Sequence, residues 1–483
     1  MARKRNQTGG KRKTGRVIML NDSILEKISQ VVGQENILRD QEDLICYGYD
    51  AAMEEALPDC VVFPGTTEQV SEIMKLSNEN EIPVYPRGAG SGLSGGSVPV
   101  KGGIVLVLTR MNKILEINID DLYAKVEPGV VVADLINEAS KIGLVYPPDP
   151  SSMKTCTMGG AVAENAGGLR GLKYGVTSDY VMALTVVAPD GRIYKTGAIT
   201  VKCVSGYDLT KLFVGSEGTL GVITEITVKL TPVPKARKSL MAVFNDIADA
   251  GKTVAAVIKS GTIPATLEIL DKITINAVED FKGIGLPREA DALLLFETDG
   301  APETTESEAQ IIEQICREHN ASEIKVAASD AERDAIWAAR RAALPSLSRV
   351  KPTCILEDAT VPRSKVPDMI QAVIDISKKY DVTIGTFGHA GDGNLHPTLI
   401  CDERDKEEME RVEKAIDEIF DAAIKLNGTL SGEHGIGLAK KKYLKMEFGE
   451  YGVDIMHSVK KALDPKNLLN PGKIFEEEKC LMQ

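Results

Sequence analysis

Apolar and polar residues recur with two different periods along the chain, and together these periods predict an α+β protein. Segment 21–33, NDSILEKISQVVG, has apolar residues at helical spacing between Asn/Asp caps and a closing glycine, which predicts one helix and a turn over 20–46. Segment 66–90 predicts a helix, a strand and a glycine-rich loop, and GGIVLVLT at 102–109 predicts a buried strand. Segment 123–150 predicts a strand, a turn and a helix that ends at a proline-rich stop.

The pattern changes near the middle of the chain. Segment 181–197 predicts a hairpin with Asp190 and Gly191 in its turn, and 218–232 predicts a long pair of strands that ends at Pro232. After TPVPKARKS at 231–239, helices over 246–260, 303–319 and 404–426 alternate with strands over 291–298 and 381–389. This alternation predicts a second domain of strands covered by helices on one face. The predicted division is an extension at 1–19, domains at 20–232 and 233–430, and a closing segment at 431–483.

Charge is distributed unevenly. The net charge is −13, yet residues 1–16 contain seven Lys/Arg and no acid, and the remainder carries 70 acidic side chains. An acidic body argues against nucleic acid as a partner. The basic arm is interpreted as a flexible extension; the alternatives are a docking arm for an acidic partner and a transit peptide, although the arm has no apolar face.

Cysteine spacing and hydropathy exclude other classes. The eight cysteines lie far apart and form no CxxC pair, which argues against an iron–sulfur cluster or a zinc ribbon and favours reduced thiols in a cytoplasmic protein. No apolar stretch approaches the roughly 20 residues that span a bilayer, and none has the form of a signal-peptide core. No integral membrane segment is therefore expected.

Three glycine-rich stretches indicate a ligand with phosphate groups. PRGAGSGLSGG at 86–96 contains GxGxxG, but SVPVKGG follows it, so no helix begins there and a Rossmann site is not expected. TCTMGGAVAENAGG at 155–168 and VGSEGTLGVITE at 214–225 are also rich in glycine. Bare backbone N–H groups from three loops can surround a pyrophosphate, with Arg87 assisting. The alternative is a surface loop with spare glycines.

Taken together, PRGAGSGLSGG, YPPDPSS, TMGGAVAENAGG, GSEGTLGVITE and NPGKIF resemble the FAD-binding module of the vanillyl-alcohol oxidase/p-cresol methylhydroxylase flavoproteins. The resemblance is strongest to the branch of D-lactate dehydrogenase and the catalytic subunit of glycolate oxidase, which also contains D-2-hydroxyglutarate dehydrogenase, and it covers the chain from about residue 20. It implies a two-lobed FAD-binding domain over 20–232, a cap domain with a ferredoxin-like antiparallel sheet, and a C-terminal tail that returns to the FAD.

The same resemblance implies a set of FAD contacts in the three stretches and the tail. These are Arg87, Gly88, Ala89, Gly90, Ser91, Gly92, Ser94, Gly95, Pro148, Asp149, Ser151, Ser152, Gly159, Gly160, Ala163, Gly168, Glu217, Gly218, Ile223 and Asn470. Some relatives tether FAD to a histidine in the first stretch. Ser91 stands near that place and the stretch has no His or Cys, so FAD is expected to bind non-covalently.

Two short histidine motifs predict a metal site. In FGHAGDGNLHPTL, a two-residue turn at Asp392-Gly393 would place His389 directly opposite His396, with Cβ atoms about 5 Å apart. Two imidazoles so placed can share a metal; the alternative is a polar pair on an exposed hairpin. In TLSGEHGIG at 429–437, Glu433 and His434 would face opposite sides of a strand, so that one of them completes a site suited to Zn²⁺, Fe²⁺ or Mn²⁺. The alternative is a loop before a helix, with Glu433 as a cap.

The resemblance implies roles for these residues. His389, His396 and Glu433 match the ligands of a divalent metal, and His434 matches the general base. Asn394 matches a substrate contact. Arg340, with Arg341 as the alternate, matches a clamp for the substrate carboxylate, although two arginines on a helix by themselves indicate a solvated face. Two departures, Leu344 and Leu356, replace polar groups of the hydroxyglutarate enzyme and favour a short hydroxy acid.

The predicted activity is therefore FAD- and metal-dependent oxidation of a D-2-hydroxy acid, with D-lactate as the expected substrate and pyruvate as the product. The hydride would pass to flavin N5. Electrons would then pass to a partner, either an electron-transferring flavoprotein or an iron–sulfur subunit. The alternatives are a glycolate oxidase catalytic subunit, a transferase like alkyl-dihydroxyacetone-phosphate synthase, and a flavin subunit that relays electrons.

Overall fold

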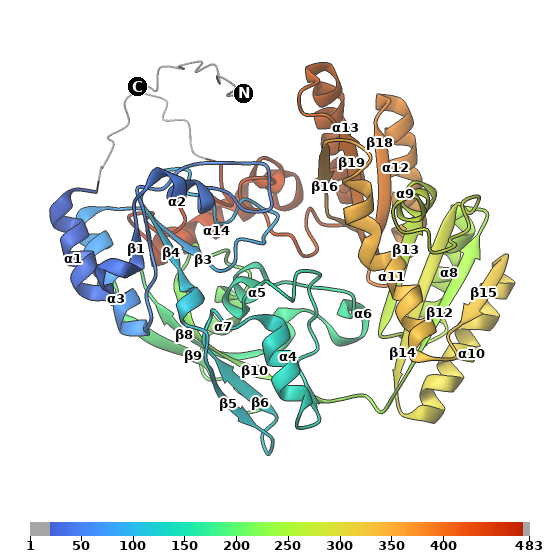
Figure 1. Cartoon of the computed structure of the whole chain (residues 1–483), viewed down its shortest axis with the longest axis horizontal. Coiled ribbons are helices and arrows are strands. Elements are labelled where there is room, and N and C mark those ends of the chain that lie inside the picture. Colours follow the sequence, from blue (N-terminus) through green and yellow to red (C-terminus); the bar gives the residue numbers. More distant parts are fainter. Residues whose placement is uncertain (1–19, 477–483) are drawn as a thin grey trace.

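The computed structural model describes residues 20–476, and the predicted basic extension at 1–19 lies outside them. The first lobe, which is blue in Figure 1, contains a sheet. The sheet has four strands in the order β1-β2-β4-β3. Its three parallel strands are buried, as is usual for parallel strands that are covered on both faces. The elements are α1 (Asp22–Val32), β1 (Ile37–Leu38), α2 (Gln41–Cys46), β2 (Cys60–Val62), α3 (Thr67–Asn80), β3 (Val84–Arg87) and β4 (Ile104–Val107).

The single helix predicted over 20–46 is divided in the structure. Helix α1 ends at Val32 because Gly33 follows with φ +87°, a conformation that suits glycine. The chain then makes a 3₁₀ turn (Gln34–Asn36), and Ile37 pairs with Val62 of β2 before α2 begins. Pairing with a strand that lies further along the chain therefore overrides the local helical signal.

The second lobe contains a five-stranded antiparallel sheet in the order β5-β6-β10-β8-β9. The hairpin of β8 and β9 is confirmed: Val187 pairs with Ile193, and Asp190 and Gly191 lie in the connecting loop. The elements are β5 (Ile114–Asn118), β6 (Tyr123–Val126), α4 (Val132–Ser140), β7 (Leu144–Val145), α5 (Met158–Glu164), α6 (Gly171–Tyr174), β8 (Val181–Val187), β9 (Ile193–Gly197), α7 (Leu209–Phe213), β10 (Val222–Lys229) and β11 (Thr231–Pro232).

The cap contains an eight-stranded antiparallel sheet in the order β15-β12-β14-β13-β18-β19-β16, with β17 also paired to β19. Its first four strands lie in the ferredoxin-like order β15-β12-β14-β13, with an additional helix, α9 (Lys272–Lys282), between β13 and β14, the two middle strands in chain order. The strands are β12 (Ala236–Phe244), β13 (Thr266–Asp271), β14 (Ala292–Gly300), β15 (Glu323–Val326), β16 (Thr353–Leu356), β17 (Ala359–Thr360), β18 (Thr383–His389) and β19 (Asn394–Cys401). The helices are α8 (Ile247–Lys259), α9 (Lys272–Lys282), α10 (Pro302–Glu318), α11 (Asp330–Leu347), α12 (Val366–Tyr380) and α13 (Lys406–Lys425).

Helices cover both faces of the cap sheet, so the prediction of one covered face is wrong. Leu240 and Phe244 of β12 point into the core under α8, α10, α12 and α13. Val243, between them in sequence, packs in a second core with Ile275 of α9 and Trp337 of α11. Successive residues of a strand face opposite sides, so apolar residues at successive positions of β12 require cover on both faces.

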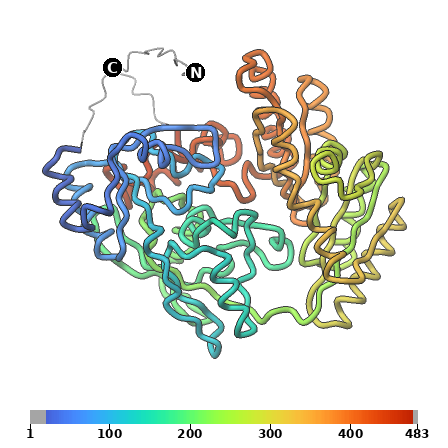
Figure 2. Tube along the Cα trace, viewed as in Figure 1, coloured from blue at the N-terminus to red at the C-terminus, as the bar shows by residue number. Residues whose placement is uncertain are grey.

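The C-terminal segment joins the cap back to the first lobe. Helix α14 (Leu444–Leu463) contains a break at Gly449, and the chain then runs beside β3. The Asn470 amide donates to the Val84 carbonyl at 2.8 Å, and Leu469 lies in the core of the first lobe. Figure 2 shows this red segment beside the blue one, so the tail returns to the first lobe, as the resemblance implies.

Among residues 20–476, no helix is both long enough and apolar enough to cross a membrane. The cysteines within this range form no disulfide with one another.

Helix α6 connects the second lobe to the cap sheet. Leu172 is buried in the cap core with Leu267, although it belongs to the second lobe. Next to it, Lys173 Nζ lies 2.7 Å from Asp299 Oδ1, and the Tyr174 hydroxyl donates to Asp299 Oδ2 at 2.7 Å. A short helix therefore gives the cap both an apolar contact and a partly buried charged contact.

Replacement of Leu172 by alanine should weaken this junction. Loss of a buried leucine side chain is expected to lower the free energy of unfolding by about 2–4 kcal/mol. Urea unfolding followed by fluorescence measures the change, with Leu212→Ala as the control because Leu212 on α7 is 37% exposed. Equal unfolding midpoints for the two variants would contradict the proposed role of Leu172.

Candidate active site

The β18–β19 hairpin carries both histidines, but in a different register from the predicted one. The loop has four residues, 390–393, rather than two, so His389 pairs with Asn394 and His396 pairs with Phe387. The predicted direct pairing of His389 with His396 is wrong. Gly391 of this loop donates to the Leu267 carbonyl at 3.1 Å, which ties the loop to β13.

The histidines nevertheless lie on one face. The register differs from the predicted one by two residues, and a shift of two preserves the face of every side chain. Their ring centroids are 5.2 Å apart. Both side chains are buried.

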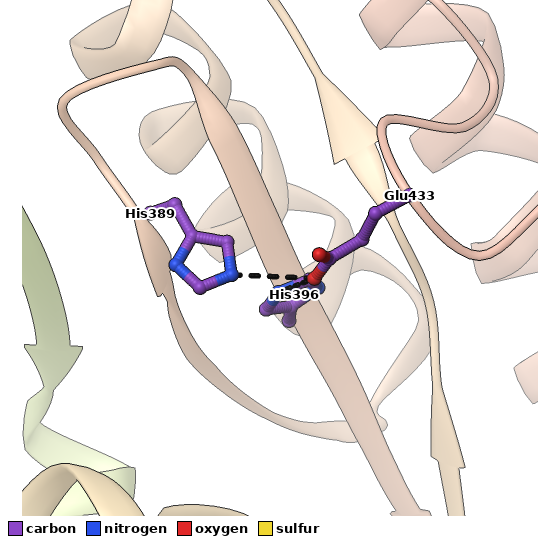
Figure 3. A group of neighbouring side chains, drawn as sticks. All are labelled: His389, His396 and Glu433. Atoms are coloured by element: carbon purple, nitrogen blue, oxygen red, sulfur yellow. Dashed lines mark hydrogen bonds and ion pairs between the residues drawn. The ribbon is translucent and has the colours of Figure 1, made fainter. Parts of the chain in front are cut away.

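Glu433 completes a compact group with the two histidines (Figure 3). Its Oε1 lies 3.2 Å from His389 Nε2 and 3.3 Å from His396 Nε2. In the described part of the chain, this is the one group of His, Cys, Asp and Glu found with the spacing of a metal site. Two imidazole nitrogens and one carboxylate fit a divalent cation and leave coordination positions open.

Glu268 contacts the His389 ring nitrogen that does not face Glu433. No sequence motif predicts this role of Glu268. Its Oε1 lies 2.6 Å from His389 Nδ1, which leaves His389 Nε2 directed toward Glu433. Histidine ligands of metals commonly have such a carboxylate on the other ring nitrogen. Although burial lowers the pKa of His389, Glu268 and Glu433 raise it above its ordinary value. The available signal was an acid within the apolar strand TLEIL at 266–270.

Arg340 contacts the same Glu268 carboxylate as His389 does. Its Nε hydrogen-bonds Glu268 Oε2, and its guanidinium lies 4.7 Å from the centroid of the Phe387 ring. Glu268 is fully buried and Arg340 is 7% exposed. The alternate, Arg341, is exposed and donates to a backbone carbonyl of its own helix at 3.0 Å. Arg340 is therefore the arginine that the fold brings to the histidine cluster.

His434 lies directly against the metal-ligand candidates. Its ring stacks on His396 with 5.2 Å between centroids and 4° between planes. The side chain is 9% exposed, and burial lowers the pKa of His434 to about 4. The imidazole is therefore neutral near pH 7 and can accept a proton.

The segment that carries Glu433 and His434 is irregular, so the predicted strand is wrong. The capping alternative also fails, because the next α-helix begins only at Leu444 and the Glu433 carboxylate faces two histidines. The two neighbours reach one cluster because the backbone turns between them and the following glycine, Gly435, has φ +86°.

Asn394 belongs to the strand that carries His396, whereas the two leucines belong to a hydrophobic core of the cap. Asn394 is buried at the start of β19, and its Oδ1 has no hydrogen-bond partner in the described chain. An unpartnered buried oxygen of this kind is available to a ligand. Leu344 and Leu356 are partly buried against the core on the α9–α11 side of the cap sheet.

The first two glycine-rich stretches approach each other closely. A Cβ on Gly88 would lie 2.2 Å from Thr157 Oγ1, and Thr157 caps α5 by accepting from the Gly160 amide. A Cβ on Gly90 would lie 2.1 Å from the Arg87 guanidinium, which itself donates to the Tyr49 carbonyl at 2.7 Å. Close packing against Thr157 therefore favours glycine at position 88, and a φ of +68° favours glycine at position 90. Arg87 also anchors the neighbouring segment.

The third stretch and the tail meet beside them. Both carboxylate oxygens of Glu217 accept backbone amides at 2.7 Å, from Ile436 and Gly437. Asn470 Nδ2 donates at 2.7 Å to the carbonyls of Gly96 and Glu217. The predicted cofactor segments are thus joined to the loop that follows His434.

Several buried polar atoms of these segments have no partner within the described residues. They are Ser94 Oγ, Glu164 Oε2 and Asn470 Oδ1. Buried polar atoms are rarely left without a hydrogen bond, so unpartnered atoms beside bare glycine backbone fit a large polar cofactor such as FAD.

The remaining predicted contacts are distributed around this region. Pro148 and Ile223 are buried, whereas Ala89 and Ser151 are exposed. The others border the same stretches: Ser91, Gly92, Gly95, Asp149, Ser152, Gly159, Ala163, Gly168 and Gly218. Among them, burial raises the pKa of Asp149 to about 6.

Two family models cover most of this architecture. Residues 58–197 match the model described as "FAD binding domain", and residues 233–474 match "FAD linked oxidases, C-terminal domain". Among solved structures, p-cresol methylhydroxylase with substrate bound is similar with a TM-score of 0.78 and 18% identity, over 94% of this chain and 96% of that one. An alkyldihydroxyacetonephosphate synthase is similar with a TM-score of 0.72 and 20% identity, over 94% and 86%. These structures establish the fold class, which is that of p-cresol methylhydroxylase.

Closer relatives define the branch. The chain is 50% identical over 461 residues to "Glycolate oxidase subunit GlcD" of Bacillus subtilis, covering 95% of this chain and 98% of that protein. It is 38% identical over 470 residues to "D-lactate dehydrogenase" of Anaerostipes hadrus, covering 93% and 97%. The chain belongs to the FAD-linked oxidases, in the branch of these two proteins, and is an FAD-binding oxidoreductase.

Replacement of Gly88 by alanine should weaken FAD binding. Overpacking against Thr157 costs about 1–3 kcal/mol, which corresponds to a roughly 5- to 150-fold higher Kd if the cost falls on the bound state. Flavin absorbance of the purified protein and titration of stripped protein with FAD measure the effect. Gly65→Ala is the control, since a Cβ there would meet no atom closer than 3.5 Å. Wild-type FAD affinity in Gly88→Ala would show that this approach does not shape the cofactor site.

Proposed function

We propose that the protein is an FAD- and metal-dependent D-2-hydroxyacid dehydrogenase that oxidises D-lactate to pyruvate. The observation that carries the proposal is the buried group of His389, His396 and Glu433, with His434 stacked on it and Arg340 joined to it through Glu268. When bound, FAD supplies the hydride acceptor. When bound, a divalent Zn, Fe or Mn ion polarises a coordinated hydroxyl oxygen.

Arg340 would bind the substrate carboxylate. Its Nε is held by Glu268, while its Nη groups make no hydrogen bond within the described chain. A guanidinium can hold a carboxylate through two parallel hydrogen bonds. Because Glu268 also holds His389, the clamp and the candidate metal ligand share one buried anchor. The carboxylate and the hydroxyl of a short hydroxy acid would therefore be oriented together.

His434 would accept the proton of the substrate hydroxyl. Its stacking on His396 fixes the ring beside the ligand set, and its neutral state leaves a ring nitrogen free to act as a base. Asn394, with its unpartnered Oδ1, would contribute a polar contact to the substrate. The burial of these residues limits competing water around the reacting atoms.

The short substrate is supported by the two departures from the hydroxyglutarate enzyme. Leu344 and Leu356 provide no polar group for a second carboxylate. The runner-up function is a glycolate oxidase catalytic subunit, which the name of the 50% identical relative supports. A transferase is less well supported, because the similarity to alkyldihydroxyacetonephosphate synthase is at 20% identity and extends to the fold alone.

Electrons would leave through a partner protein. The described residues contain no second cluster of candidate metal ligands besides His389, His396 and Glu433. A relative named as a subunit supports assembly with other chains. An electron-transferring flavoprotein or an iron–sulfur subunit in the cytoplasm is the proposed acceptor, and the FAD is proposed to be bound non-covalently.

Anaerobic visible spectra of the purified protein test this function. D-lactate, L-lactate, glycolate and D-2-hydroxyglutarate are added in turn, and loss of the oxidised flavin absorbance is followed. We expect D-lactate to bleach the flavin fastest and D-2-hydroxyglutarate to react slowly, since Leu344 and Leu356 offer no polar group to a second carboxylate. Fastest bleaching by glycolate would favour a glycolate oxidase catalytic subunit. An absorbance spectrum that none of the four acids changes would contradict the proposed dehydrogenase activity.

Substitution of His434 by glutamine should slow flavin reduction by about 10²- to 10⁴-fold while FAD remains bound, because the proton acceptor is lost. Stopped-flow measurement of flavin bleaching by substrate gives the rate, and absorbance at the start gives the FAD content. His319→Gln is the matched control, since His319 lies at the end of α10, far along the chain from the cluster. Retention of most of the wild-type rate would remove His434 from the role of base.

A further inference from the structure

The segment that carries Glu433 and His434 has no regular secondary structure to hold it. Residues 431–435 belong to no helix or strand. The bridge between Thr360 and Thr429 ends before them, and the next helical turn begins only at Lys441. Yet Glu433 and His434 both reach the same buried cluster. Some other contact must therefore fix the backbone of this turn.

Asp358 supplies that contact with a single carboxylate oxygen. Its Oδ2 accepts from the Ser431 hydroxyl at 2.7 Å and from the backbone amide of Gly432 at 2.9 Å. The same oxygen accepts the amides of Glu433 and His434, each at 3.0 Å. Asp358 is completely buried. Hydrogen bonds to an ionised acceptor are stronger than neutral ones, so this convergence strongly favours one conformation of the turn.

The turn is also closed on itself. Ser431 Oγ, which donates to Asp358, accepts the Gly435 amide at 2.9 Å. Lys440 Nζ lies 3.7 Å from Asp358 Oδ2 and donates to the Leu430 carbonyl at 3.0 Å. The buried negative charge thus has a buried cation beside it, and both groups contact the same turn.

Asp358 is in turn fixed to the strand of His396. It lies between β16 and β17, both of which pair with β19. On one side of it the Glu357 amide donates to the Pro397 carbonyl at 3.0 Å, and on the other side Ala359 pairs with Leu395. The backbone of Asp358 therefore runs directly beside His396.

We propose that Asp358 is a positioning residue that holds the 431–434 turn against β19, so that Glu433 reaches His389 and His396 and His434 stays stacked on His396. This inference rests on the proposed function for the meaning of the cluster. Asp358 itself contacts neither the two histidines of the hairpin nor the proposed substrate clamp by any hydrogen bond. Its action passes through the backbone amides of the turn.

The test compares three variants of the full-length flavoprotein. Asp358→Asn keeps the shape of the side chain and removes its charge. Ser431→Ala removes one of the four donors and is the milder variant, should Asp358→Asn fail to fold. Asp464→Asn is the matched control: Asp464 is also buried beside a lysine, Lys460, and also accepts two backbone amides, those of Leu468 and Leu469, but in the tail.

Two readouts separate the parts of the inference. Hydrogen–deuterium exchange of the peptide that covers 431–435 reports the order of the turn without any metal or substrate. Titration of chelator-treated protein with Zn²⁺, followed by calorimetry, reports the ligand set. In Asp358→Asn we expect faster exchange of this peptide and a Zn²⁺ Kd raised by about 10- to 100-fold, the usual size for lost supporting contacts around a metal. Ser431→Ala should change both in the same direction by less, and Asp464→Asn should change neither.

Other results would overturn the positioning role of Asp358. Unchanged exchange at 431–435 in Asp358→Asn, or faster exchange with unchanged Zn²⁺ affinity, would overturn the positioning role. A loss of Zn²⁺ affinity that appears equally in Asp464→Asn would assign the effect to general destabilisation and overturn it as well. Wild-type protein that binds no Zn²⁺, Mn²⁺ or Fe²⁺ would overturn both the metal part of the proposed function and this inference, whereas weak metal binding in the variants alone would leave the proposed function in place.

Discussion

Three buried carboxylates, two of which accept backbone amides, hold the candidate site together. Glu217 accepts two amides from the loop after His434, Asp358 accepts three from the turn around Glu433, and Glu268 fixes a histidine and an arginine. A buried charge is costly unless it is paired or hydrogen-bonded, so each carboxylate strongly favours the arrangement that satisfies it. Segments separated by up to 220 residues are joined in this way.

This arrangement joins the two lobes and the cap at the candidate site. The lobes contribute the glycine-rich stretches that fit FAD, and the cap contributes the histidine cluster and Arg340. The turn at 431–435 lies between them, bonded to the cap through Asp358 and followed by residues bonded to the lobes through Glu217. Hydride transfer needs flavin and substrate in contact. This turn connects the lobes, which would hold the flavin, with the cap, which would hold the substrate.

Much of the fold and part of the site could be predicted from local sequence. The hairpin at 181–197 is confirmed because Asp190-Gly191 suits a tight turn between alternating strands. The predicted register of the histidine hairpin is wrong, because the loop has four residues rather than two. Gly391 of this loop bonds to β13, and no local sequence pattern reveals that contact. The faces were still correct because a strand repeats every two residues. Glu268 and Asp358 were missed because their partners lie 72 or more residues away.

The sequence by itself determined the class of fold, the glycine-rich stretches and the residue types of the cluster, because these depend on periodicity and on motifs within a few residues. Tertiary structure alone decided that Arg340 rather than Arg341 reaches the cluster and that Glu433 and His434 lie in an irregular turn. It also decided which buried carboxylates contact Arg340 and this turn. The physical reason is that local preferences set turns and strands, whereas the direction of a buried charge depends on partners that only folding brings within hydrogen-bond distance.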